Sequence, residues 1–194
     1  MRKFVIAAAA LSLFALPYGA SAQERIALDV RGVLASATGD LADADVGTGF
    51  GFGATLALRV QQHLHLYGGW DWLHFGADEA FAGGDADFEE TGYTFGLRYE
   101  HPLRASWRTG FRLEGGGTYK HVEIEDGDGD LIADSDHKLG FELGAGLVTP
   151  LGDTWRVTTM GRFRSLSPEF DVGPATTSGT FRYVALEIGL TRRF

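Results

Sequence analysis

The sequence has no cysteine, only 5 prolines among 194 residues and, after its first 22 residues, no long apolar run. The absence of cysteine excludes disulfides and thiolate chemistry, so the stability of the fold must come from another source. A transmembrane helix needs about 20 consecutive apolar residues, so a helical membrane protein is excluded as well. A membrane protein built of strands stays open, because strands cross a bilayer with shorter segments.

The beginning of the chain has the three regions of a secretory signal peptide. The basic pair Arg2 and Lys3 precedes an apolar run, and an Ala-Ser-Ala pattern ending at Ala22 follows it. The apolar run is too short for a membrane-spanning helix. We therefore predict that residues 1–22 are a signal peptide, cleaved after Ala22 on export. The remaining 172 residues, 23–194, are of the usual size for one domain.

Apolar and polar residues alternate in eight separate segments of this domain. In the last segment, Val184, Leu186 and Ile188 alternate with smaller or polar residues. Successive side chains of a strand point to opposite faces, so this pattern predicts strands with one apolar and one polar face. Each segment spans about ten residues, the length that a tilted strand needs to cross a bilayer. The segments cover residues 26–34, 50–60, 64–72, 93–99, 111–119, 139–147, 155–163 and 184–190.

The connections between the segments alternate between short and long. Short turns follow the second, fourth and sixth segments, at Gln61, His101 and Pro150. Short turns at one end and long loops at the other are typical of outer-membrane barrels. We therefore predict an all-β fold, an eight-stranded antiparallel up-and-down transmembrane β-barrel with short periplasmic turns and long extracellular loops. The expected long loops are residues 37–48, 76–90, 122–136 and 166–178.

The polar face of the segments carries long side chains of both charges, with glycines between them. A soluble barrel with its apolar face inside would have no need for those glycines on its surface. The interior of an eight-stranded barrel is only wide enough to be filled by side chains, so glycines there leave room for arginines. We expect Arg98 and Glu100 to lie beside Arg112 and Glu114, because opposite charges stabilise an antiparallel pair. The predicted lumen charge network consists of Asp29, Arg31, Arg59, Asp71, Arg98, Glu100, Arg112, Glu114, Glu142, Arg162 and Glu187.

Aromatic residues on the apolar face gather near both ends of the segments. Amphipathic rings at two membrane interfaces produce this arrangement, whereas rings placed for core packing would be scattered. We therefore predict that the apolar face contacts lipid. The two groups are Tyr99, Trp107, Trp155 and Phe194 beside the short turns, and Phe50, Trp72, Tyr93 and Tyr119 beside the long loops.

The end of the chain, "ALEIGLTRRF", resembles the closing-strand signal that the barrel assembly machinery of bacteria reads. Glu187, Gly189 and Phe194 match this signal, whereas Arg192 stands where an apolar or aromatic residue is usual. The whole mature chain resembles the small eight-stranded outer-membrane barrels, the family that includes OmpX and the N-terminal domain of OmpA. The resemblance implies a monomeric protein of the Gram-negative outer membrane, with lipid and lipopolysaccharide as its surroundings, an interior salt-bridge network and no open pore.

The expected long loops are strongly acidic. They hold 18 of the 26 acidic residues of the chain and no Lys or Arg. Loss of Arg2 and Lys3 with the signal peptide would bring the formal charge from −9 to −11. Nucleic acid is therefore excluded as a partner, because its phosphates would be repelled.

The densest acidic segment, "VEIEDGDGDLIADSD", offers carboxylates to a hard cation such as calcium. It is not an EF-hand, because Leu131 stands where that loop requires glycine and His137 where it requires glutamate. The alternatives are a solvated acidic hairpin, divalent ions shared with lipopolysaccharide phosphates, and an acidic composition suited to a saline habitat. No other cofactor is predicted. The predicted metal residues are Asp126, Asp128, Asp130, Asp134 and Asp136.

Enzymatic activity is not predicted. Some eight-stranded barrels modify lipid A with a serine or histidine near the outer interface, but the candidate residues here belong to no recognisable motif. We predict an integral outer-membrane barrel with a structural or surface-interaction role; a narrow pore and a lipid A-modifying enzyme are the alternatives. The candidates for such an enzyme are His74, His121 and His137 with Ser135, Ser165 or Ser167.

Overall fold

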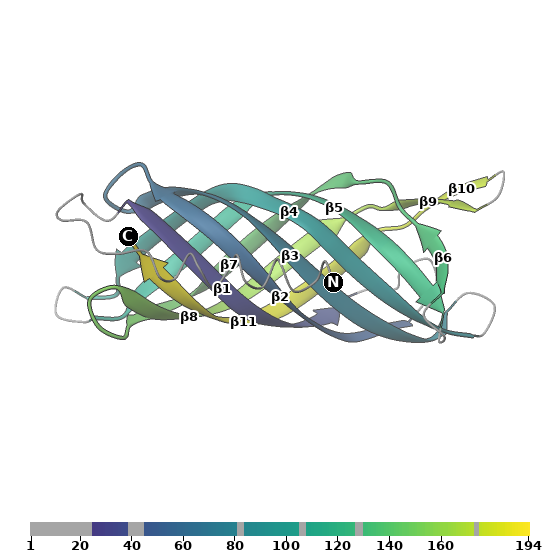
Figure 1. Ribbon diagram of the computed structural model, residues 1–194, viewed down its shortest axis with the longest axis horizontal. Helices are drawn as coiled ribbons and strands as arrows, with labels where there is room; N and C mark the ends of the chain where they lie inside the picture. Colours follow the sequence, from purple (N-terminus) through teal and green to yellow (C-terminus); the bar gives the residue numbers. More distant parts are fainter. Residues whose placement is uncertain (1–24, 39–44, 81–83, 105–107, 127–129, 173–174) are drawn as a thin grey trace, which may run out of the picture.

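The computed structural model of the chain describes residues 25–38, 45–80, 84–104, 108–126, 130–172 and 175–194. Eight strands form the wall of a barrel, and three short strands extend it at one end (Figure 1). The wall consists of β1 (Ile26–Ala37), β2 (Asp45–Arg59), β3 (Leu64–Ala80), β4 (Gly84–Pro102), β5 (Gly110–Asp126), β7 (Lys138–Pro150), β8 (Trp155–Leu166) and β11 (Phe181–Arg193). The extension consists of β6 (Leu131–Asp134), β9 (Glu169–Val172) and β10 (Ala175–Ser178).

Each wall strand pairs antiparallel with the next along the chain, and β11 pairs with β1 to close the ring. The closing pair runs from Ala27 opposite Arg193 to Ala37 opposite Tyr183. The predicted all-β, eight-stranded antiparallel barrel is therefore confirmed. Among the described residues there is no helix long and apolar enough to cross a membrane.

The two ends of the barrel differ. At one end, which we call the short-turn end, β2 is followed by β3 after residues 60–63, and β7 by β8 after residues 151–154. At the other, the hairpin end, β3 and β4 run on through most of the expected loop 76–90. β5 and β6 likewise occupy much of 122–136, and β9 and β10 much of 166–178. Much of the sequence expected as long loops at these three places therefore belongs to strands.

The strands continue because apolar and polar side chains still alternate there. The apolar side chains, however, change from the outer face to the inner face. Along most of the wall, apolar side chains face outward, as at Leu34 and Leu143, which are both more than half exposed. At the hairpin end the inward positions become apolar instead, as at Phe75, Phe88 and Ile124, which are fully or almost fully buried. An outer face that leaves the lipid meets water, so polar residues are favoured outside and apolar ones inside.

Aromatic rings on β2, β3, β4 and β5 lie where the outward face changes from apolar to polar. Phe50 packs against Trp72 with ring centroids 6.1 Å apart, and Tyr93 lies opposite Tyr119 in the register of β4 and β5. We call these four residues the aromatic belt. At the short-turn end Arg192 lies over the rings of Trp155 and Phe194. Trp107, which was expected with that group, lies outside the described residues.

Candidate functional site

The barrel interior holds a continuous network of ion pairs, and Asp71 on β3 is one of its centres. This carboxylate is fully buried and meets three cations from three other strands. Arg31 approaches it to 2.9 Å and Arg164 to 2.7 Å, and Lys120 forms a third ion pair. A buried charge is tolerated only when it is paired and hydrogen-bonded, and three partners meet that requirement.

A second part of the network lies on β4 and β5, toward the short-turn end. The register places Arg98 opposite Glu114 and Glu100 opposite Arg112. The corresponding N–O distances are 2.6 and 2.7 Å. Arg112 is 3.7 Å from Glu114 on its own strand, so the cross-strand partners are the closer ones. Asp29 joins this group through Arg98 at 2.5 Å.

The third part of the network connects the other two across β7, β8 and β11. Arg162 lies 2.7 Å from Glu114, 3.0 Å from Glu142 and 2.9 Å from Glu187. Glu142 also accepts a hydrogen bond of 2.7 Å from the hydroxyl of Tyr67 on the far side of the barrel. The network therefore spans the lumen from wall to wall.

Glycines make room for these side chains. Arg31 lies opposite Gly53 on β2 and opposite Gly189 on β11. A Cβ atom at Gly53 would be 3.0 Å from Nη2 of Arg31, and one at Gly189 would be 3.0 Å from its Cβ. A side chain at either position would crowd the arginine against the wall. The glycines on the inner face are therefore part of the packing of the network.

Of the residues predicted for this network, all but Arg59 take part in the ion pairs just described. Arg59 instead lines a cavity of about 300 Å³ at the short-turn end, together with His65, Arg156 and Arg193. Glu90 is a member that the sequence reasoning missed. It lies 2.5 Å from Lys120 and accepts a hydrogen bond from Tyr183. It had been assigned to a loop, although it continues the inward positions of β4.

Little free space is left in the lumen. The cavity among Asp29, Arg98, Arg112 and Arg162 has a volume of about 20 Å³, and one water molecule needs about 10–15 Å³. Toward the hairpin end the lumen is filled by an apolar cluster, which we call the apolar plug. It consists of Val33, Ala35, Val46, Leu73, Phe75, Ala86, Phe88, Val122, Ile124, Leu166, Phe170, Phe181, Tyr183 and Ala185.

Tyr183 joins the apolar plug to the charges below it. Its ring packs against Phe75 and Phe181, with centroids 5.3 Å away in both cases. Its hydroxyl donates a hydrogen bond of 2.6 Å to Glu90. The ionic network and the plug are therefore continuous, and together they fill the described lumen between the hairpin end and the cavity at the short-turn end.

The residues predicted as an assembly signal lie on and just beyond β11. Glu187 points into the lumen toward Arg162, and Gly189 faces Arg31. The backbone nitrogen of Phe194 donates a hydrogen bond of 2.9 Å to the carbonyl of Ile26. Glu187 and Gly189 thus have places in the folded barrel, apart from any part in assembly.

The structure does not gather the predicted calcium ligands around one point within its described residues. The backbone nitrogen of Asp130 donates a hydrogen bond of 2.9 Å to the side chain of Asp126, which closes a turn. Asp136 is exposed, and Asp128 lies outside the described residues. Asp134 lies near His121 and Glu123 instead, with one potential ligand atom of each within 4.8 Å of the others.

Beyond the aromatic belt, the outer surface of β4, β5 and β6 carries a group of carboxylates that we call the acidic rim. Glu89 lies opposite Glu123, Asp87 opposite Glu125, and Asp134 on β6 opposite Glu123. Glu89, Glu123 and Glu125 each have a carboxylate oxygen within 4.8 Å of the others. Like charges directly opposite each other on a sheet are destabilising, so this surface favours the presence of cations.

The residues considered for lipid A chemistry do not assemble into a triad among the described side chains. Ser135 is buried, and its hydroxyl accepts a hydrogen bond from the backbone nitrogen of Val122. His121 is paired with Glu123 and His137. His74 lies 3.7 Å from both Asp87 and Glu89. Ser165 is on β8, opposite Phe141 and Arg182, and Ser167 is exposed beyond its end.

The fold has solved relatives among outer-membrane proteins. Neisserial surface protein A (NspA) has a TM-score of 0.61 at 15% identity, covering 87% of this chain and 97% of that one. OprG from Pseudomonas aeruginosa has a TM-score of 0.61 at 14% identity, covering 89% and 97%. A major outer membrane protein from Thermus thermophilus has a TM-score of 0.51 at 15% identity, covering 87% and 99%. At these identities the likeness concerns the fold.

No curated protein matches the sequence. The family described as outer membrane protein beta-barrel domain matches residues 6–194. Since this match extends over nearly the whole chain, the protein belongs to that family.

Proposed function

We propose that this member of the outer membrane β-barrel family is a closed, monomeric barrel with a structural or surface-interaction role in the bacterial outer membrane. The observation that carries the proposal is the filled lumen. The 20 Å³ cavity among the central arginines leaves no water-filled path, and the apolar plug closes the hairpin end. A barrel that neither conducts nor carries an assembled catalytic triad among its described residues acts through its surface.

The filled lumen is tested by conductance of the folded protein in planar lipid bilayers. We expect no stable conductance steps, because hydrated ions cannot pass between paired side chains at van der Waals contact. A reconstituted open porin in the same bilayers is the positive control. Large, stable steps from the purified barrel would overturn the proposal and favour the narrow pore.

The proposal includes export and assembly. Residues 1–22 act as the signal peptide with cleavage after Ala22, and the barrel assembly machinery recognises the last strand through Glu187, Gly189 and Phe194. Short turns in this architecture face the periplasm, so the hairpin end faces outward.

The part of Phe194 in assembly is tested by Phe194→Ser. We expect the precursor to be exported and cleaved but not inserted, since the substitution removes the terminal aromatic and leaves the interior network intact. Tyr99→Ser, which removes another aromatic side chain at the short-turn end, is the matched control and should insert. A Phe194→Ser protein that forms a heat-modifiable, membrane-inserted barrel would contradict the assembly role.

The surface interaction that the rim favours is with divalent cations and lipid. Three clustered carboxylates lie just beyond the aromatic belt, where phosphates of lipopolysaccharide would lie in the outer leaflet. Calcium or magnesium shared between rim carboxylates and these phosphates would relieve the repulsion of both. Calcium at Asp126, Asp128, Asp130, Asp134 and Asp136 stays a prediction beside it. Chelation should weaken lipopolysaccharide binding to the purified barrel, measured by co-sedimentation.

A further inference from the structure

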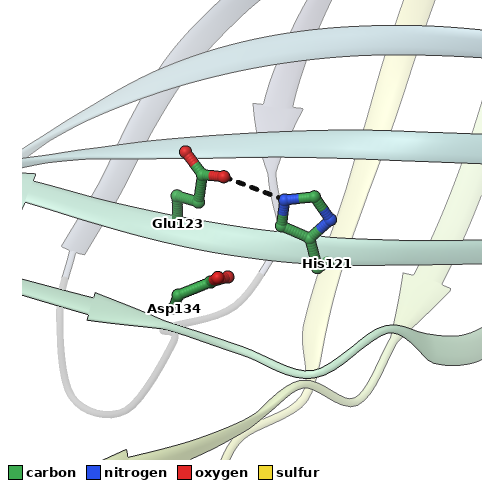
Figure 2. Close-up of side chains that lie close together, drawn as sticks. All are labelled: His121, Glu123 and Asp134. Atoms are coloured by element: carbon green, nitrogen blue, oxygen red, sulfur yellow. Dashed lines mark hydrogen bonds and ion pairs between the residues drawn. The ribbon is translucent and has the colours of Figure 1, made fainter. Parts of the chain in front are cut away.

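We propose that His121, Glu123 and Asp134 form a binding site for a divalent transition metal of the zinc type on the outer face of the barrel. The site goes beyond the closed-barrel function and beyond calcium or magnesium at the acidic rim, because an imidazole nitrogen is one of its ligands. Figure 2 shows the three side chains near one another on β5 and β6, with the contact between His121 and Glu123 dashed.

The fold brings these residues together in a simple way. His121 and Glu123 are two positions apart on β5, so both side chains face outward. Asp134 on β6 lies directly opposite Glu123. β6 pairs with β5 just beyond the point where β7 leaves it, since the pairing of β5 with β7 ends at Lys120 opposite Lys138. The carboxylate of Asp134 on β6 is therefore the third potential ligand, beside His121 and Glu123 of β5.

The distances suit a small cation. Nε2 of His121 is 3.0 Å from Oε1 of Glu123, and one potential ligand atom from each of the three residues lies within 4.8 Å of the others. Zinc binds imidazole nitrogen and carboxylate oxygen at about 2.0–2.2 Å, so tetrahedral ligand atoms are roughly 3.4 Å apart. Rotations of the partly exposed carboxylates are sufficient to reach that geometry. Three protein ligands leave a fourth position for water or a lipid phosphate.

His137 holds the imidazole of His121 in place. Nδ1 of His121 is 3.1 Å from Nε2 of His137, and the two ring centroids are 4.4 Å apart. A metal-binding histidine commonly donates its second ring N–H to a neighbour, which fixes the tautomer. When Nδ1–H of His121 donates to His137, Nε2 keeps its lone pair, which faces Glu123. His137 in turn packs against Tyr119 of the aromatic belt, at 5.0 Å.

The neighbouring charges attract a cation to this place. Glu89 and Glu125 each have an oxygen within 4.8 Å of Glu123, and Asp87 lies opposite Glu125. Trp72 donates a hydrogen bond of 3.1 Å to Glu89 and so holds that carboxylate at the rim. Oxygen ligands alone would favour calcium or magnesium, whereas the imidazole gives preference to zinc and related metals.

The test is zinc titration of the folded full-length barrel in detergent by isothermal calorimetry, with calcium present in large excess. We expect one zinc ion per chain, and cobalt in its place should give the intense visible absorption of a tetrahedral site. His121→Phe keeps an aromatic ring against His137 but removes both nitrogens, so it should abolish the cobalt spectrum and weaken zinc binding at least about tenfold. Heat-modifiable mobility shows that the variant is folded.

His74→Phe is the matched control. His74 also faces outward beside two carboxylates, each 3.7 Å away, and it lies outside the proposed site. It should leave zinc affinity unchanged. His137→Phe should weaken zinc binding by about 10- to 100-fold if it orients His121. Equal zinc affinity in His121→Phe and the unaltered protein, or displacement of zinc by calcium, would overturn the proposal. Neither result would bear on the closed lumen, which conductance tests separately.

Discussion

The carboxylates of the lumen and those of the acidic rim lie on opposite faces of the same strands. Those of the lumen are paired with cations, whereas those of the rim lie opposite other carboxylates. Glu90 on the inner face of β4 is 1% exposed and bonds Lys120 and Tyr183. Its neighbour Glu89 points outward to the rim, where it lies opposite Glu123. Two successive residues of β4 thus have different surroundings. Glu90 belongs to the ion-pair network of the lumen, and Glu89 belongs to a surface with an excess of negative charge.

The comparison separates what holds the barrel together from what it presents to its surroundings. In the lumen each carboxylate meets arginine or lysine from other strands, so the charges act as cross-links between strands. At the rim only histidines lie within ion-pair distance of Asp87, Glu89 and Glu123 among the described residues. Interior charges are expensive to leave unpaired, whereas rim charges are partly hydrated and are free to attract ions.

The largest difference is expected from the same substitution on the two sides. Asp71→Asn should lower the free energy of unfolding by about 3–5 kcal/mol, because three buried cations lose the carboxylate that they share. Urea-driven unfolding of the barrel in detergent micelles, followed by electrophoretic mobility, measures this loss.

Asp87→Asn at the rim is the matched control and should leave the free energy of unfolding within about 0.5 kcal/mol of the unaltered protein. Equal effects of the two substitutions would contradict the difference between lumen and rim. Such a result would mean that water enters the lumen and screens its charges as strongly as those of the rim. It would favour the narrow pore.

The fold could be predicted from the sequence where one rule holds over a whole segment. The outward apolar positions of the wall, such as Leu34 and Leu143, follow the period of two without interruption. The rule failed at the hairpin end, because the apolar face changes sides between Trp72 and Phe75 when the strand leaves the lipid. Reading the alternation alone, whatever its sign, would have continued β3 and β4 and assigned Glu90 to the lumen.

The candidate metal site of His121, Glu123 and Asp134 could be predicted less well from the sequence. That His121 and Glu123 share a face follows from their spacing, but Asp134 joins them through the register of β6, which no local pattern specifies. The aspartates of 126–136 form a dense acidic run in the sequence, which predicted a calcium site. Asp126 instead stabilises a turn, because its side chain accepts a hydrogen bond from the backbone nitrogen of Asp130. Proximity in sequence was therefore a poor guide to which carboxylates meet.

A smaller effect is expected for the specific pairing within the lumen. In a double-mutant cycle, Arg98→Ala and Glu114→Ala should each destabilise the barrel, and the double variant should lose less than the sum. The second substitution removes a charge that is already unpaired, so a coupling of about 0.5–3 kcal/mol is expected. The cycle of Arg112→Ala with Glu114→Ala is the control and should show a smaller coupling, since those side chains are 3.7 Å apart. Equal coupling in both cycles would mean that the charges interact as a diffuse pool.

The smallest effect is expected at the rim. Glu125→Gln removes one of three clustered carboxylates and relieves the repulsion of Glu125 by Asp87 opposite it. In a chelator and at low salt the barrel should therefore become more stable, by at most about 0.5 kcal/mol. The gain should vanish near 1 M salt, where the Debye length is about 3 Å, shorter than the separation of these charges across the strands. A closed lumen, as proposed, would keep mobile ions away from Asp71, so the effect of Asp71→Asn should change little with salt. A loss of stability in Glu125→Gln under chelation would contradict the view that the rim carboxylates repel one another in the absence of a cation.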